Sequence, residues 1–163
     1  MKHIFSLFLF VALLQANGQN VTFTAKSGDA ELDVTLSDMN VKATADFQLF
    51  KNEMKLAYNV TDQKLEYLKT TIKMAPADIY MTLEIGKITG KTVDAVTQCY
   101  QSNKSKGWGV IAKEMGIKPG SSEFHQLKSS AKGKNDKMKG NGNSHGNNGK
   151  GNGNGNGKGK GKK

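Results

Sequence analysis

The sequence predicts an all-α protein, a small helical bundle with a disordered basic C-terminal tail. Two observations support this fold class. Apolar residues recur every three or four positions through residues 46–131, which is typical of amphipathic helices. Residues 132–163 are almost entirely Lys, Gly and Asn, and such a segment buries too little apolar surface to offset the entropy lost on ordering.

The expected helices are marked by apolar stripes and by residues that favour helix ends. Thr61 and Thr92 suit helix N-caps, Pro76 suits a first turn, and Gly90 suits a helix end. The helix at 76–89 carries apolar residues around more than one face, so we expect it to be the central helix. The stripes lie at residues 47–57, 65–72, 79–88, 93–100, 108–115 and 124–131.

Residues 19–45 give no single prediction. Leu32, Val34 and Leu36 alternate as in a strand. The two leucines also fit a helical stripe that continues to Met39, so periodicity alone does not choose between the two. We expect an extended or weakly structured lead-in, with at most a short helix or strand, before the helical domain.

The first part of the chain, residues 1–18, has the pattern of a secretory signal peptide. Lys2 precedes an apolar run from Ile4 to Leu14, and Ala16 and Gly18 form a small-x-small cleavage site. The apolar run is too short to span a bilayer, which favours cleavage after Gly18 over an uncleaved membrane anchor. We expect an exported protein, periplasmic or extracellular, with no membrane span after cleavage.

The basic charge is concentrated in the tail. Residues 132–163 hold nine lysines and one acid, Asp136, and so carry +8 of the chain's net charge of +10. All 24 basic residues are lysine, so the chain lacks the planar guanidinium that binds phosphate or carboxylate with two hydrogen bonds. The sequence predicts diffuse binding of anionic polymers, nucleic acid included but without sequence specificity, by Lys132, Lys134, Lys137, Lys139, Lys150, Lys158, Lys160, Lys162 and Lys163.

No catalytic or metal-binding motif is recognisable. Cys99 falls on an apolar helical stripe, which favours a buried small side chain over a nucleophile or an intermolecular disulfide. His125 and His145 lack the spacing of zinc ligands, and we expect His125 on or near a helix surface. Trp108 lies between two glycines and fits a core position better than an exposed stacking platform. We therefore expect a non-enzymatic protein with no cofactor or metal.

The segment Gly107–Ser121 reads GWGVIAKEMGIKPGS. Together with Pro-Ala-Asp at 76–78 and Glu-Phe-His at 123–125, it resembles a recurring group of small exported bacterial proteins. Members have a leader, a helical core and a Gly/Lys/His-rich end, and the resemblance covers about residues 75–128. It implies export and an α-fold, and it supplies no functional residues.

Three functions remain open from the sequence. We expect binding of polysaccharide, extracellular nucleic acid or an acidic cell surface through the tail, which could otherwise be a solubilising appendage. The second is a protein-interaction module whose helical core docks an envelope partner. The third is a helix-turn-helix DNA-binding protein, because Ala112 and Gly116 have the spacing of that motif. Its turn at 118–121 is longer than the motif requires, and the following helix offers only Lys128 as a cation for phosphate.

Overall fold

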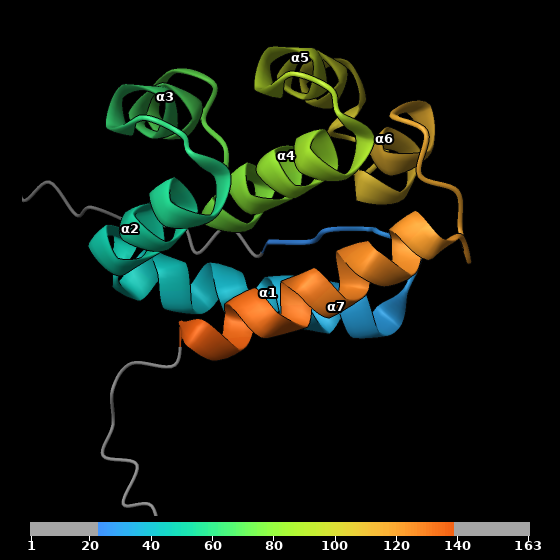
Figure 1. Cartoon of the computed structure of the whole chain (residues 1–163), viewed down its shortest axis with the longest axis horizontal. Coiled ribbons are helices and arrows are strands. Elements are labelled where there is room, and N and C mark those ends of the chain that lie inside the picture. Colours follow the sequence, from blue (N-terminus) through green and yellow to red (C-terminus); the bar gives the residue numbers. More distant parts are fainter. Residues whose placement is uncertain (1–22, 139–163) are drawn as a thin grey trace, which may run out of the picture.

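The computed structural model describes residues 23–138, which form a helical bundle without β-strands (Figure 1). The predicted all-α fold class is therefore confirmed. The elements are α1 (Ala30–Ala45), α2 (Phe47–Tyr58), α3 (Asp62–Glu66), the π-helical turn η1 (Tyr67–Thr71), α4 (Pro76–Thr89), α5 (Val93–Asn103), α6 (Trp108–Glu114) and α7 (Ser122–Lys137).

The helices begin at residues that the sequence marks as caps. Pro76 occupies the first turn of α4, and Gly90 ends that helix with a left-handed φ of 69°. In five of the described helices, the residue before the first turn accepts a hydrogen bond from the backbone N–H three positions along: Asp29, Asp46, Thr61, Thr92 and Ser121. Each of these bonds satisfies a donor that has no partner within its helix.

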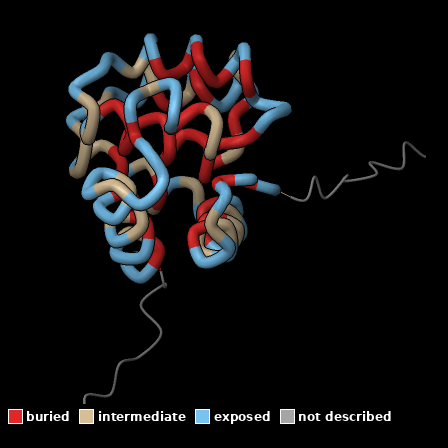
Figure 2. The backbone as a smooth tube through the Cα atoms, turned by 90° about the vertical axis from the view of Figure 1, so that its right-hand side faces the viewer, coloured by how far each residue is buried: buried red, intermediate tan, exposed pale blue. Residues whose placement is uncertain are grey.

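Helix α4 is the centre of the bundle, as the sequence predicts. Every residue from Pro76 to Gly86 is buried. Helices α1, α2, α5 and α7 all pack against α4. Figure 2 shows the buried positions gathered in the interior and the exposed positions on the outer turns. The core is therefore built around one helix that is buried on all sides.

The expectation of an extended or weakly structured lead-in at residues 19–45 is wrong for residues 30–45, which form the 16-residue helix α1. The stripe that includes Leu32 and Leu36 is buried, and α1 packs against α4 and α7, whereas Val34 is 69 % exposed. The strand-like alternation is thus incidental. The Asp29 side chain caps α1, and burial of one helical face selects the helix.

Helix α7 continues past Ala131, where the sequence predicted the end of the helical domain. Lys42 Nζ donates to Asn135 Oδ1 over 2.9 Å, and Asn135 Nδ2 donates to Asp38 Oδ2 over 2.8 Å. Met138 is only 4 % exposed. The first residues of the expected disordered tail therefore belong to the fold, because polar contacts with α1 hold a helix that lacks apolar periodicity.

An N-terminal strap, residues 23–29, precedes α1 and crosses the start of α6. The backbone N–H of Trp108 donates to the carbonyl oxygen of Ala25 over 2.8 Å, and that of Gly109 donates to Lys26 over 3.0 Å. In Figure 1 the strap is the blue segment that runs between α4 and α1. These bonds satisfy backbone donors at the start of α6 that have no partner within the helix.

The strap explains why two glycines flank Trp108. A Cβ atom on Gly107 would lie 2.3 Å from Cβ of Lys26, and Gly107 also has a φ of 92°. A Cβ atom on Gly109 would lie 2.6 Å from the carbonyl oxygen of Ser27. The strap therefore approaches α6 too closely for any other residue at either position without a local shift.

The expected signal peptide and the expected tail after Met138 lie outside the described residues. Within residues 23–138, none of the helices combines the length and apolar character needed to cross a membrane.

Candidate functional site

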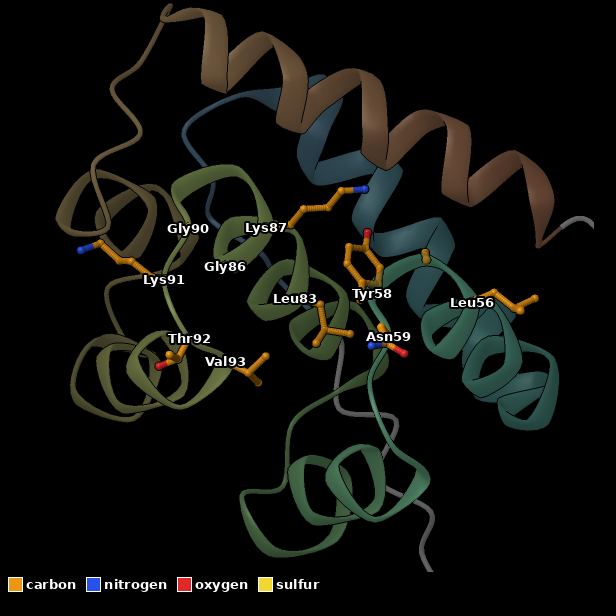
Figure 3. A pocket seen from close by; sticks show the side chains of 11 residues that line it. Leu56, Tyr58, Asn59, Leu83, Gly86, Lys87, Gly90, Lys91, Thr92 and Val93 are labelled. Atoms are coloured by element: carbon orange, nitrogen blue, oxygen red, sulfur yellow. The ribbon is translucent and has the colours of Figure 1, made fainter.

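A groove opens between the end of α2, the second half of α4 and the last turns of α7. It consists of two adjacent hollows of about 560 and 360 Å³, whose linings have Ala57, Tyr58 and Lys87 in common. Figure 3 shows the first hollow, with Tyr58 between α2 and α4. We call this surface, centred on Tyr58 and lined by Lys87, Lys91, Lys134 and Lys137, the Tyr58 groove.

Two ammonium groups, from two different helices, lie over the Tyr58 ring. Tyr58 is the last residue of α2, which ends because Asn59 adopts a left-handed conformation with φ 51°. Lys87 Nζ lies 5.5 Å from the centroid of the ring, and Lys134 Nζ lies 5.9 Å from it. Both distances fall within the range of cation–π attraction. In Figure 3 the Lys87 side chain extends from α4 toward the hydroxyl end of the ring.

A buried carboxylate fixes the orientation of the ring. The Tyr58 hydroxyl donates a 2.5 Å hydrogen bond to Oε2 of Glu84, which is 2 % exposed on α4. Tyr80 packs edge-on against Tyr58 with ring centroids 6.4 Å apart. Burial, with the nearby Tyr80 and Glu84, raises the pKa of Tyr58 far above its ordinary value. The phenol therefore stays protonated and continues to donate to Glu84 at any physiological pH.

The charged residues that line the groove are mostly cationic. The lining contains four lysines and a single carboxylate, Glu84. Lys134 is partly compensated by Glu53 at 3.6 Å. Lys87 and Lys91 make no ion pair within residues 23–138. Figure 3 shows the Lys91 side chain extending from the α4–α5 turn away from Tyr58 and Lys87.

Three of the nine predicted polyanion-binding lysines lie in the described part of the chain, all on α7. Lys134 and Lys137 line the Tyr58 groove, and Lys132 is exposed on the same helix. The structure thus brings two of the predicted residues together around one aromatic ring. The remaining six lie outside the described residues: Lys139, Lys150, Lys158, Lys160, Lys162 and Lys163.

Sequence reasoning did not identify Tyr58, Glu84 or Lys87 as candidate site residues. Their association depends on the packing of α2, α4 and α7, which local spacing does not reveal. One signal was present: Glu84 is the one acid in the apolar stripe at 79–88 of the helix predicted to be central. A carboxylate at such a position requires a hydrogen-bonding partner, which here is Tyr58.

The packing of α6 and α7 does not favour the helix-turn-helix interpretation. Helix α7 packs mainly on α1 and α4, whereas α6 packs mainly on α5. Lys128, the one cation expected on the second helix, instead bridges Asp29 at 2.9 Å and Glu31 at 3.0 Å. Because two carboxylates already neutralise its ammonium group and accept its hydrogen bonds, Lys128 is poorly suited to bind a phosphate.

The remaining candidate residues occupy structural positions. Trp108 is buried in the core at 2 % exposure, as expected, and His125 is exposed on α7. Cys99 is buried, and its Sγ donates to Oε2 of Glu114 over 3.2 Å. Burial and that carboxylate raise the pKa of the thiol, so it is not activated as a nucleophile. No group of three or more potential metal ligands occurs within residues 23–138.

No family model, curated protein or solved structure matches the chain.

Proposed function

We propose that this protein is exported and binds anionic polymers outside the cytoplasm, such as polysaccharide, extracellular nucleic acid or an acidic cell surface, without catalysing a reaction. The observation that carries the proposal is the pair of ammonium groups from Lys87 and Lys134 on the Tyr58 ring in an open groove. An aromatic ring flanked by cations offers both a stacking surface and charge to a sugar or base bearing anionic groups.

The charge balance of the groove supports an anionic partner. Lys87 and Lys91 face solvent without a carboxylate partner in the described part of the chain. The one acid in the lining, Glu84, is buried and accepts the Tyr58 hydroxyl. A polymer with regularly spaced charges would contact several of these lysines at once and release its condensed counterions, which makes binding favourable at low salt.

The groove also leads into the rest of the basic sequence. Helix α7 contributes Lys134 and Lys137 to the lining and ends one residue before Met138. Residues 139–163, which follow directly, contain six lysines and no acid. The proposed binding surface therefore starts on the folded domain and continues along the chain, so one polymer could contact both.

Salt-dependent binding of full-length mature protein, beginning at Gln19, tests this proposal. Fluorescence anisotropy with a labelled single-stranded oligonucleotide and with labelled heparin would be measured from about 50 to 200 mM salt, where contacts of this kind weaken. In the variant Lys87→Gln/Lys91→Gln we expect weaker binding and a logarithmic salt slope smaller by about 1.4 for the oligonucleotide, because two contacts of about 0.7 each are lost.

A matched control removes the same charge elsewhere. In Lys55→Gln/Lys64→Gln the lost lysines already pair with Asp62 and Asp94, so we expect a smaller change in slope. Equal effects of the two double variants would show that only net charge matters and would remove the groove from the proposal. Absence of binding to either polymer at 50 mM salt would overturn the proposed function.

A deletion separates the polymer-binding function from docking of a protein partner. It should begin at Lys139, because residues 132–138 belong to the fold. Loss of polymer binding on deletion supports a contribution from the tail lysines. Capture of the same envelope protein by the full-length and shortened proteins, without polymer binding by either, would favour the interaction module.

A further inference from the structure

A second cavity, of about 650 Å³, lies at the start of α4, away from the Tyr58 groove. Its walls come from the N-terminal strap, η1, the end of α5 and the start of α6. Phe23, which is half-buried, offers the most exposed large apolar side chain of its lining, whereas Met74, Trp108 and Ile111 are 3 %, 2 % and 0 % exposed. The volume is that of a site for a small organic molecule.

A hydrogen-bonded carboxylate holds the aromatic wall of this cavity in place. Asp78 accepts hydrogen bonds from Trp108 Nε1 at 2.7 Å, from the Tyr100 hydroxyl at 2.9 Å and from the backbone N–H of Ala75 at 3.2 Å. The Tyr100 and Trp108 rings stack with centroids 5.4 Å apart. The Asp78 carboxylate therefore already has hydrogen-bond partners within the protein, and the aromatic wall is in place before any ligand binds.

Three lysines from separate segments line the same cavity: Lys69 from η1, Lys73 from the loop before α4, and Lys104 from the end of α5. Lys69 Nζ lies over the Phe47 ring at 3.4 Å. Lys73 and Lys104 make no ion pair within residues 23–138. The only carboxylate in the lining is the buried Asp78, so the cavity has an excess of positive charge.

The backbone at this edge is also unusual. Lys73 has a φ of 61°, a left-handed conformation that residues other than glycine rarely adopt. The preceding turn, η1, is π-helical, a form found often at functional sites. Both features lie in the short segment that brings Lys69 and Lys73 to the cavity.

We propose that this cavity binds a small amphipathic anion, a carboxylate or sulfonate with an apolar body. The apolar body packs against Phe23 and the small exposed part of Trp108, and the anionic group lies toward Lys73 and Lys104. An anion is favoured because Lys73 and Lys104 form no ion pair within residues 23–138, and because the one carboxylate near Lys104, that of Asp78, is buried and already accepts hydrogen bonds from Trp108 and Tyr100. An apolar body is favoured because aromatic and aliphatic side chains make up most of the remaining wall.

The single tryptophan of the chain, Trp108, provides the readout. The mature full-length protein would be titrated with 4-phenylbutyrate and, separately, with its neutral amide, while tryptophan fluorescence is recorded. We expect a saturable change with the acid and at least about tenfold weaker binding of the amide, because the amide lacks the charge that the lysines attract.

Two double variants locate the site. Lys73→Gln/Lys104→Gln should weaken 4-phenylbutyrate binding by about tenfold. Lys55→Gln/Lys64→Gln removes the same charge outside both the cavity and the Tyr58 groove and should leave binding unchanged. Circular dichroism shows whether each variant is folded, and Lys104→Gln alone gives the same test if the first double variant is not.

Three results would overturn the proposal. One is the absence of a saturable change with the acid, and another is equal binding of the acid and the amide. The third concerns the chain before Phe23, the residue at which the described chain begins beside the cavity. Binding that occurs only in a protein shortened to begin at Phe23 would show that residues 19–22 are the natural occupant.

Discussion

Trp108 Nε1 donates a 2.7 Å hydrogen bond to Oδ1 of Asp78, and this bond joins α6 to the central helix α4. Trp108 is 2 % exposed and stacks on Tyr100, which donates to the same carboxylate. The three residues form one hydrogen-bonded unit between α4, α5 and α6. Loss of any member leaves a polar atom without its partner in a largely buried environment.

Replacement of Trp108 should therefore destabilise the fold severely. We expect Trp108→Ala to lower the free energy of unfolding by about 3–5 kcal/mol, because it removes a buried aromatic side chain and one donor to Asp78. Urea unfolding followed by circular dichroism measures the change. Leu56→Ala is the control: Leu56 is 84 % exposed, and its truncation should have little effect. A stable Trp108→Ala protein would contradict a core role for this residue.

The buried Asp78 should give the fold a measurable pH dependence. Burial raises the pKa of Asp78 above 3.8, although the hydrogen bonds from Trp108 and Tyr100 oppose the shift. The unfolded state then ionises first as the pH rises, so this residue stabilises the fold fully below about pH 3.8. That contribution is lost as the pH rises toward and through the folded-state pKa.

The difference between two proteins isolates this effect. The free energy of unfolding of the native protein, minus that of Asp78→Asn, should decrease as the pH rises from about 3.8, because the variant cannot ionise at this position. Other carboxyl groups contribute equally to both proteins and cancel. A difference that increases over the same pH range would mean that the hydrogen bonds outweigh burial.

The close approach of the strap to α6 predicts opposite effects of two alanine substitutions. Gly109→Ala should destabilise the protein by about 1–3 kcal/mol, because its Cβ would lie 2.6 Å from the Ser27 carbonyl oxygen. Gly133→Ala, in the open on α7, should stabilise the protein by up to about 1 kcal/mol, because alanine has the higher helix propensity. Thermal unfolding measures both, and equal effects would contradict the position of the strap.

The extension of α7 predicts that Asn135 contributes to stability although it lies in a sequence that resembles a disordered tail. Asn135→Ala removes a donor to Asp38 and an acceptor for Lys42, and should cost about 1–2 kcal/mol. Lys132→Ala, on the exposed side of the same helix, should change stability by less than about 0.5 kcal/mol. Urea unfolding distinguishes the two, and an Asn135→Ala protein as stable as Lys132→Ala would contradict the docked end of α7.

The sequence predicted the helices that carry a clear apolar stripe of their own. It missed the helical segments whose formation depends on contacts with residues far away in the chain. The stripes of α2, α4, α5 and α6 carry enough apolar residues to mark their helices and buried faces. Helix α1 was missed because Leu32 and Leu36 fit two periods, and only packing against α4 and α7 decides between them. The end of α7 was missed because Asn135 is held by Lys42, 93 positions earlier in the chain.

The candidate site was predicted less completely than the fold. Composition pointed to lysines, and two of those on α7, Lys134 and Lys137, do line the Tyr58 groove. It could not indicate that Tyr58 and Lys87 lie beside them, because these residues belong to other helices and meet only through packing on α4. Charge is visible in composition, whereas the shape of a groove depends on tertiary contacts.

The lysines after Met138 give the last prediction, which concerns the proposed binding of anionic polymers. Residues 139–163 contain no aromatic residue and no arginine, so their contribution should depend on charge and not on base or sugar identity. Changing all six lysines of this segment to Gln should weaken the binding of heparin and single-stranded DNA alike, and should reduce the salt slope. Shuffling the order of the residues within 139–163 keeps the charge and should leave binding nearly intact. Anisotropy titrations of both variants measure these effects. Strong binding to one polymer that persists at high salt, and that shuffling destroys, would instead indicate a specific recognition sequence in this segment.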